Sequence, residues 1–348
     1  MTVAPPPAAL VRYAREADPL LRDFLGQKGR DLRGLPLDLF PVHEAITDYV
    51  LRGGKRVRGT LVLLGCEAAG ADPGVAQNAS LALELLHAYL LAHDDFMDGD
   101  ELRRGGPTLH VVLGKKSAHL GESLAVLAGS LCEAWALELV LSSPVPPERT
   151  VAAARLLSSA LQQVIIGQSL DIVAPFEPPL DDAGVLRLQA LKTGSYTFEL
   201  PLRVGAVLGG AGARLLHALE GFARPLGIAF QIADDLLGAL GSPEVTGKPS
   251  GSDLREGKRT LLVARALRMA SAQDAAFVKA TLGRSGVSEA EVEEMRAVLV
   301  RSGAAASCQE EADRLLAEAL LVLDGAPIPA SVAKSLREIG TYSVRRNS

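Results

Sequence analysis

The chain has 348 residues, of which 48% are hydrophobic and only 4% aromatic. This length and apolar content are enough for a large buried core in one or two domains. A net charge of -5 excludes the strongly basic balance of many nucleic-acid-binding proteins, so no nucleic-acid partner is expected.

Targeting and membrane signals are absent from the sequence pattern. Residues 1–7 lack a basic region followed by an apolar core, so no signal peptide is expected. The most apolar stretch, around residues 123–141, is interrupted by Glu133 and Glu138, and no membrane span is predicted. The three cysteines are scattered and are interpreted as core residues of a reducing compartment. We therefore expect a soluble, cytoplasmic protein.

The apolar periodicity predicts a succession of helices and no strand. The predicted helices cover about residues 8–25, 43–53, 55–70, a segment after the turn at 72–74, 120–141, 148–173, 181–208 and 215–240. A break at 105–107 precedes Thr108, which is expected to cap a short helix. A glycine- and proline-rich loop is expected over 241–257, and further helices up to about residue 345. The prediction is one all-α domain over residues 1–348.

The segment 93–98 is the first feature that carries chemistry. Asp94 and Asp98 lie four residues apart, on one face of a helix, and Asp95 stands beside them. Clustered carboxylates suit Mg²⁺, which is usually shared with substrate phosphates. A solvated acidic helix end is the alternative, but the apolar run 81–92 before the cluster indicates a buried helix instead.

A second aspartate pair, Asp234 and Asp235, lies near the end of another apolar helix, 215–240. Basic residues follow both clusters: Arg103 and Arg104 after the first, and Lys248 and Lys258 after the second. Guanidinium and ammonium groups bind phosphate oxygens well. If the two helices face each other, their carboxylates can hold several Mg²⁺ around one diphosphate.

Further basic residues form a separate group, which indicates a second anionic ligand. Lys55 and Arg58 are expected on one helix face, next to the glycines 53–54 that allow backbone to approach a phosphate. His87 lies seven residues before Asp94, about two turns away on nearly the same face. A core histidine is the plain alternative.

Lys192 and Thr193 place a cation and a hydroxyl in an otherwise apolar run. A surface lysine is the plain alternative for this pair taken alone.

These motifs occur in a fixed order: 53–59, 94–98, 103–105, 192–193, 230–235 and 247–249. Over about residues 40–262 the chain resembles the trans-isoprenyl diphosphate synthases, or polyprenyl synthetases, a family that includes farnesyl and geranylgeranyl diphosphate synthases. The resemblance implies an all-α isoprenoid synthase fold, with helices bundled around a deep apolar cavity, and usually a homodimer.

The resemblance also implies an activity and a set of site residues. The chain would be a Mg²⁺-dependent prenyltransferase that condenses isopentenyl diphosphate with an allylic diphosphate. The implied ligands of isopentenyl diphosphate are Lys55, Arg58, His87 and Arg104. Those of the allylic diphosphate are Arg103, Lys192, Lys248 and Lys258. Asp94, Asp98 and Asp234 would bind three Mg²⁺, supported by Asp95 and Asp235. The catalytic group near the developing allylic cation would be Lys192, Thr193 and Gln231.

One position departs from the family pattern. The second motif commonly reads DDxxD, but its third position here is Gly238. The missing carboxylate would supply at most an outer contact to the metal cluster, so activity is expected to survive.

Two other functions fit the same fold. A class I terpene cyclase would not need the group of Lys55, Arg58 and His87, and its second metal motif usually carries Asn, Ser and Glu. A non-catalytic partner subunit tends to lose aspartates of the first motif or the paired arginines, both of which are intact here.

The length of the product should depend on residues upstream of Asp94. A growing chain extends along this helix, at roughly 1.5 Å per residue. Tyr89 lies five positions upstream and Leu90 four, and a bulky aromatic at the fifth position resembles short-chain synthases. We expect geranylgeranyl diphosphate, then farnesyl diphosphate, then longer chains. Ordinary core packing is the plain alternative for Tyr89.

Overall fold

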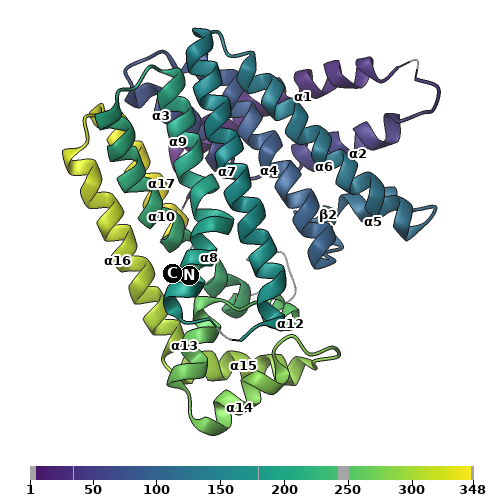
Figure 1. Ribbon diagram of the computed structural model, residues 1–348, viewed down its shortest axis with the longest axis vertical. Coiled ribbons are helices and arrows are strands. Elements are labelled where there is room, and N and C mark those ends of the chain that lie inside the picture. The colour runs from purple at the N-terminus through teal and green to yellow at the C-terminus, as the bar shows by residue number, and fades with distance from the viewer. Residues whose placement is uncertain (1–4, 34, 179, 242–250, 346–348) are drawn as a thin grey trace. The chain divides into compact units, whose positions relative to one another are not determined.

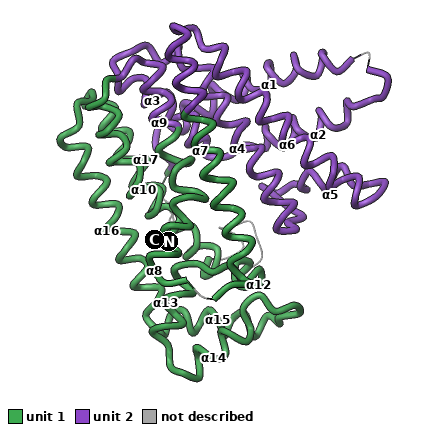
Figure 2. Tube along the Cα trace, viewed as in Figure 1, with its two compact units in different colours: residues 1–5, 156–200, 212–348 green, residues 6–155, 201–211 purple. Residues whose placement is uncertain are grey.

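The computed structural model describes residues 5–33, 35–178, 180–241 and 251–345, and this part of the chain is almost entirely helical (Figure 1). It divides into two compact units, coloured separately in Figure 2. Unit 1 contains Met1–Pro5, Leu156–Leu200 and Gly212–Ser348, and unit 2 contains Pro6–Arg155 and Pro201–Ala211. The single domain expected over residues 1–348 stays a prediction.

Unit 2 is built around α4, whose middle is buried over almost its whole circumference. Helices α3 and α6 pack along α4. The elements of this unit are α1 (Ala8–Asp31), α2 (Phe40–Leu51), α3 (Val57–Ala68), the 3₁₀-helix η1 (Pro73–Ala76), α4 (Gln77–Asp98), β1 (Leu102–Arg103), β2 (Gly106–Pro107), α5 (Leu109–Leu113), α6 (Ala118–Leu141), the start of α7 (Pro147–Val173) and most of α9 (Leu200–Leu208).

Unit 1 is built around α10, which packs against α16, α17 and the π-helix η3. Its elements are the rest of α7, η2 (Ala174–Phe176), α8 (Asp182–Gln189), η3 (Ala190–Glu199), α10 (Ala213–Leu240), α12 (Ser252–Glu256), α13 (Leu261–Met269), α14 (Ala272–Thr281), α15 (Glu289–Arg301), α16 (Ala304–Gly325) and α17 (Ala330–Arg345). The all-α prediction is therefore confirmed.

Three local predictions were wrong. A β-hairpin, β1–β2, forms where no strand was expected. Helix α3 begins at Val57, so Lys55 precedes the helix and does not share a helical face with Arg58. In the predicted loop 241–257, residues 252–256 form the short helix α12, and residues 242–250 lie outside the described residues.

The long helix predicted over 181–208 is interrupted by a π-helix, η3. Gly167 of α7 and Gly227 of α10 allow the backbones of these two helices to approach that of η3. A Cβ on Gly167 would lie 2.5 Å from the backbone nitrogen of Lys192, and a Cβ on Gly227 would lie 2.7 Å from the oxygen of Gly194. This tertiary packing explains why periodicity alone did not reveal the π-helix, a form that is frequent at functional sites.

By length and composition, α6 and the stretch Pro147–Phe176 could each cross a membrane. Within their most apolar windows, 44% and 28% of the residues are buried inside the structure. Core helices of soluble proteins pass the same test, so the absence of a membrane span stays a prediction.

Helices α3 and α9 pack with their backbones in close contact. A Cβ on Gly65 would lie 2.2 Å from the backbone oxygen of Leu202, and a Cβ on Gly205 would lie 1.8 Å from that of Val62. Real Cβ atoms do not come so near, so the interface requires glycine from both helices.

We therefore expect Gly205→Ala to lower the free energy of unfolding by about 1–3 kcal/mol, because the added methyl overpacks a backbone contact that cannot yield. Gly26→Ala, in the middle of α1, is the matched control, since no atom lies within 4 Å of its Cβ. It should raise stability by about 0.5–1 kcal/mol through helix propensity. Urea unfolding measures both, and equal midpoints for the two variants would contradict the close packing.

Candidate active site

Asp94 and Asp98 lie on the last turn of α4, where both are half-buried. The helix ends because Gly99 takes a left-handed conformation, with φ 70°. The negative end of a helix dipole favours a cation, and two carboxylates on one face strengthen this preference. The two carboxylates therefore lie at a helix end that favours a cation, and their binding of a metal stays a prediction.

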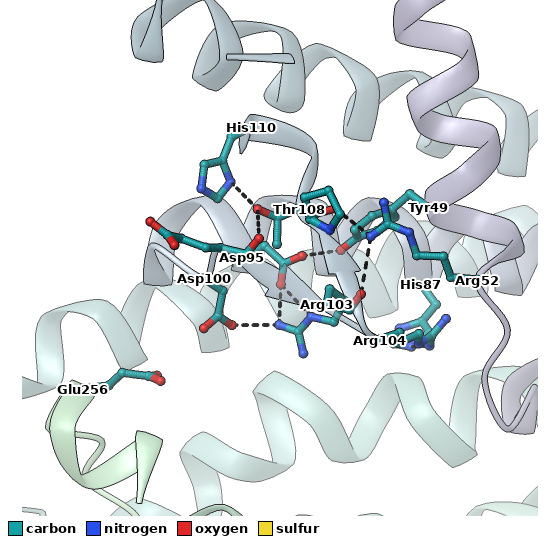
Figure 3. A network of polar contacts seen from close by, with 12 residues as sticks. Tyr49, Arg52, His87, Asp95, Asp100, Arg103, Arg104, Thr108, His110 and Glu256 are labelled. Atoms are coloured by element: carbon teal, nitrogen blue, oxygen red, sulfur yellow. Dashed lines mark hydrogen bonds and ion pairs between the residues drawn. The ribbon is translucent and has the colours of Figure 1, made fainter. Parts of the chain in front are cut away.

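Asp95 is fully buried and serves a different purpose (Figure 3). One carboxylate oxygen accepts a hydrogen bond from the hydroxyl of Tyr49, and the other accepts from Nε of Arg103 at 2.7 Å. Burial raises the pKa of Asp95, and the positive charge of Arg103 opposes this shift. With both oxygens engaged, Asp95 is better suited to orient Arg103 than to bind a metal directly.

The hairpin β1–β2 separates the side chains of two adjacent arginines. Its turn residues, Arg104 and Gly105, have φ values of 52° and 73°, the left-handed pair of a two-residue hairpin turn. Arg103 turns toward Asp95 and also donates to Asp100 at 3.0 Å. Arg104 donates to the backbone oxygen of Gly53 instead. Sequence reasoning found both arginines but not the turn that divides them.

Arg104 also lies beside His87, with 3.4 Å between Nη2 and Nε2 (Figure 3). His87 is half-buried on α4, and its pKa is lowered well below the usual value, first by burial and then by the charges of Arg58 and Arg104. Three of the four residues expected to bind isopentenyl diphosphate thus influence one another within unit 2.

Arg56, which sequence reasoning did not single out, anchors the segment 53–58 to the interior of unit 2. Arg56 has φ 48° and is buried. Its guanidinium forms ion pairs with Asp18 at 2.9 Å and with Glu84 at 3.2 Å. In the sequence, Arg56 is the middle one of three basic residues, and only its burial in the structure distinguishes it from Lys55 and Arg58.

Glu84 completes this support by accepting a hydrogen bond at 2.9 Å from the backbone nitrogen of Gly59, at the start of α3. Lys55 is exposed and Arg58 is half-buried on either side of the buried Arg56. The loop therefore presents two cations around one buried ion pair, although not by the helical spacing that the sequence suggested.

The second aspartate pair lies on α10 in unit 1. Asp234 is exposed, whereas Asp235 is buried and accepts hydrogen bonds from the amides of Gln189 and Gln231, the latter at 2.7 Å. Burial, and next the nearby charge of Asp253, raise the pKa of Asp235. Asp234 is thus the member of the pair that presents its carboxylate at the surface, while Asp235 positions Gln231.

Lys192 and Thr193 lie in the π-helix η3, and both are half-buried. The ammonium of Lys192 lies 2.6 Å from a carboxylate oxygen of Asp171 on α7. Lys258 lies 2.6 Å from Glu256 and 3.6 Å from Asp253. Lys248 lies outside the described residues.

The predicted ligands of isopentenyl diphosphate all belong to unit 2, namely Lys55, Arg58, His87 and Arg104. The other two predicted sets are divided between the units. Asp94, Asp98 and Arg103 belong to unit 2, and Asp234, Lys192, Thr193, Gln231 and Lys258 belong to unit 1. That the two aspartate motifs face each other stays a prediction.

Asp94, Asp98 and Asp234 are the candidate donors for Mg²⁺. Among the described residues, no group of three or more His, Cys, Asp or Glu side chains is arranged to hold a metal ion by itself. Mg²⁺ characteristically uses one or two protein carboxylates and completes its shell with water and substrate phosphates. Half-buried Asp94 and Asp98 and exposed Asp234 fit that chemistry.

Comparisons with known proteins identify the family of the chain. A family profile described as polyprenyl synthetase matches residues 41–299. The chain is 35% identical over 277 residues to a short chain isoprenyl diphosphate synthase of Methanothermobacter thermautotrophicus, covering 79% of both chains. It is 34% identical over 324 residues to a geranylfarnesyl diphosphate synthase of Aeropyrum pernix, covering 92% of this chain and 95% of that one.

A similar solved structure is the geranylgeranyl pyrophosphate synthase of Corynebacterium glutamicum, complexed with isoprenyl diphosphate and magnesium. It matches with a TM-score of 0.90 and 29% identity, over 96% of this chain and 99% of that chain. The fold and the site thus define a trans-prenyltransferase with the all-α isoprenoid synthase fold.

The chain belongs to the polyprenyl synthetase family, among the short-chain isoprenyl diphosphate synthases. Its relatives include farnesyl, geranylgeranyl and geranylfarnesyl diphosphate synthases.

The lowered pKa of His87 predicts a specific pH dependence of stability. Below about pH 6.5 the unfolded chain takes up a proton at this histidine while the folded chain does not, so stability falls with falling pH. The slope is at most about 1.4 kcal/mol per pH unit.

His87→Gln should remove this contribution, so the variant should gain stability relative to wild type as the pH falls from 7 to 5. Chemical unfolding at several pH values measures the difference. His119→Gln, at a side chain that is 92% exposed, controls for the substitution itself. A difference between His87→Gln and wild type that does not change with pH would contradict a histidine that stays neutral in the folded protein.

Proposed function

We propose that this enzyme is a Mg²⁺-dependent geranylgeranyl diphosphate synthase that adds isopentenyl diphosphate to an allylic diphosphate. Farnesyl diphosphate is the second candidate product and longer chains the third. The observation that carries the proposal is the division of the paired arginines, because Arg103 joins the first aspartate motif while Arg104 joins His87 and the loop at 53–58.

Two separate anion sites follow from that division. Arg104, His87, Arg58 and Lys55 would bind the diphosphate of isopentenyl diphosphate. Burial, and next the charges of Arg58 and Arg104, lower the pKa of His87, and this supports the group because a neutral imidazole can donate or accept a hydrogen bond. Two arginines provide the forked donors that suit phosphate oxygens.

The allylic diphosphate would be held by Arg103, Lys192, Lys248 and Lys258. Arg103 is pre-oriented by Asp95, which also accepts from Tyr49, and by Asp100, so it need not lose freedom when the ligand binds. Its fixed guanidinium supports a role in stabilising the charge that develops on the leaving group.

Asp94, Asp98 and Asp234 would hold three Mg²⁺, with Asp95 and Asp235 in supporting positions. Bound there, the cations neutralise the charge of a departing diphosphate. The carbon–oxygen bond of the allylic diphosphate breaks, and its electron pair leaves with the diphosphate. The allylic cation then forms a carbon–carbon bond with the alkene of isopentenyl diphosphate, and the departing diphosphate accepts the proton that is lost.

The side chains around the cation have to exclude water while the new bond forms. Thr193 and Gln231, with Lys192, are the residues proposed to face the allylic carbon. Gln231 is positioned by its hydrogen bond to buried Asp235, and this leaves its amide oxygen available for the developing positive charge.

We also propose a soluble, cytoplasmic homodimer without a membrane span. Large apolar side chains are exposed on α6, where Leu127 is 62% exposed, and on α7, where Ile166 is 54% exposed. Such side chains, repeated along long helices, suit a subunit interface better than open solvent. The net charge of -5 supports the absence of a nucleic-acid partner.

Purified enzyme with Mg²⁺, isopentenyl diphosphate and dimethylallyl diphosphate should give a linear prenyl diphosphate, identified by mass spectrometry. Asp94→Ala should lose at least about 100-fold in kcat, because a preorganised charge-stabilising group is removed. Asp100→Asn, which alters a partner of Arg103 but no proposed metal ligand, should lose much less.

A hydrocarbon product would identify a terpene cyclase, and no turnover by the wild-type protein would favour a non-catalytic partner subunit. Near-normal turnover by Asp94→Ala at saturating Mg²⁺ would reject the metal role of the first motif.

Product length is proposed to depend on Tyr89 and Leu90. Tyr89 is buried, and its ring packs edge-on against His93 at a centroid distance of 4.7 Å. A Cβ on Gly129 of α6 would lie 2.6 Å from the ring of His93 and 3.5 Å from that of Tyr89, so both rings pack between α4 and α6. One turn further from Asp94, fully buried Leu85 and Leu86 would form the next barrier.

Tyr89→Ala should therefore lengthen the product by one or more five-carbon units, because it removes the aromatic floor. Tyr89→Phe retains the ring and should leave the product length unchanged. Chromatography of the dephosphorylated products measures both. The same product spectrum from Tyr89→Ala and wild type would place the floor elsewhere.

A further inference from the structure

Arg52 is the C-cap residue of α2 and belongs to none of the motifs that the sequence indicated. Nε and Nη2 of its guanidinium donate to a carboxylate oxygen of Asp48 at 2.9 and 2.5 Å. This pair alone would contribute little to stability, because Asp48 is 63% exposed and solvent screens its charge. The side chain of Arg52 is nevertheless only 11% exposed, so a further part of the structure covers it.

The other end of the guanidinium contacts the hairpin β1–β2 (Figure 3). Nη1 of Arg52 donates to the backbone oxygen of Pro107 at 2.6 Å and to that of Arg103 at 3.4 Å. A Cβ on Gly106 would lie 2.6 Å from Cζ of Arg52, so the guanidinium lies against the backbone of β2. One side chain at the end of α2 therefore bridges both strands of the hairpin.

The hairpin needs such support, because each strand has only two residues and an isolated hairpin is at best marginally stable in water. Arg103 has further partners, since its side chain donates to Asp95 and Asp100. Arg104 lies at the turn, with φ 52°, and its place follows from that of the two strands. Loss of Arg52 should therefore disturb Arg104 more than Arg103.

Arg104 also contacts the residues that follow Arg52 in the chain. It donates to the backbone oxygen of Gly53, and a Cβ on Gly54 would lie 2.9 Å from its Cζ. The hairpin thus meets the start of the segment 53–58, and Arg52 joins the two, covalently on one side and by hydrogen bonds on the other.

We propose that Arg52 is a positioning residue for isopentenyl diphosphate, because it fixes the hairpin to the end of α2 and so places Arg104 beside His87 and the segment 53–58. This inference rests on the proposed function and adds to it a residue from outside the motifs. The guanidinium of Arg52 is occupied by a carboxylate and two backbone oxygens and does not bind the substrate itself.

Arg52→Ala should raise the KM for isopentenyl diphosphate about 10-fold, since a binding group that is misplaced loses much of its effect. The kcat and the KM for dimethylallyl diphosphate should change less than about threefold, because a rise in KM at constant kcat reports lost binding and not lost catalysis. Arg52→Lys can still donate to the oxygen of Pro107 and should recover part of the affinity. An unchanged KM for isopentenyl diphosphate in Arg52→Ala would overturn the proposal.

Arg149→Ala is the matched control within unit 2. Nη1 of Arg149 donates to the backbone oxygen of Leu208 at 3.2 Å, and its guanidinium lies against Gly210, so the kind of contact is the same. Both alanine variants should lose a few degrees in melting temperature. Only Arg52→Ala should change a KM, and an equal rise in both variants would reduce the role of Arg52 to general stability and overturn the proposal.

A double-mutant cycle tests whether Arg52 acts through Arg104. Arg104→Ala should raise the KM for isopentenyl diphosphate at least as much as Arg52→Ala does. Adding Arg52→Ala to Arg104→Ala should raise it less than about twofold further, because both changes remove one shared contribution. Fully additive effects would contradict a positioning role.

An NMR titration of His87 tests the geometry without turnover. Burial lowers the pKa of His87, and so do the positive charges of Arg58, Arg104, Arg103 and Arg56. When Arg104 moves away, this pKa should rise, so it should be higher in Arg52→Ala than in wild type and unchanged in Arg149→Ala. The same titration in all three proteins would overturn the proposal.

The wild-type protein distinguishes this failure from that of the proposed function. A wild-type protein that makes a prenyl diphosphate, with KM values and a His87 titration that Arg52→Ala leaves unchanged, would overturn only the role of Arg52. A wild-type protein that makes no prenyl diphosphate would overturn the proposed function, and this proposal with it.

Discussion

The site depends on buried carboxylates that cannot remain unpaired. Removing a charge from water costs several kcal/mol unless partners are provided. Glu84, Asp95 and Asp235 are all nearly or fully buried, and each satisfies this constraint by fixing its neighbours. Glu84 holds Arg56 and the start of α3, Asp95 holds Tyr49 and Arg103, and Asp235 holds two glutamines. The groups that would meet substrate are therefore positioned before any ligand arrives.

Arg56 and Arg104 have left-handed backbone conformations, and their side chains reach other partners than those of their neighbours in sequence. Non-glycine residues at positive φ are uncommon and are concentrated at functional sites. Arg56 lies between exposed Lys55 and half-buried Arg58 and is itself buried in its ion pairs. Arg104 forms the turn that separates it from Arg103. Neighbours in sequence thus reach different partners.

In the helical framework, glycines allow neighbouring helices to pack closely. The backbones of α3 and α9 approach through Gly65 and Gly205, and η3 is approached through Gly167 and Gly227. Gly238 belongs to the same class of contact, but a carboxylate occupies its free space instead of a backbone. The absence of a side chain at Gly238 therefore leaves room for the carboxylate of Asp253, which belongs to another helix.

The sequence by itself determined the helical architecture, the order of the motifs and the family, because apolar periodicity and the spacing of Asp94, Asp98, Asp234 and the cations are local properties of the chain. It also identified Arg103, Arg104 and His87 as candidates. The spacing of Asp94 and Asp98 already set them apart from Asp95, but the burial and the partners of Asp95 and Arg56 follow only from the tertiary structure. The hairpin turn, the π-helix and the approach of Asp253 to Gly238 were decided by the tertiary structure alone, because each depends on contacts between segments that are distant in sequence or on a backbone conformation that packing imposes.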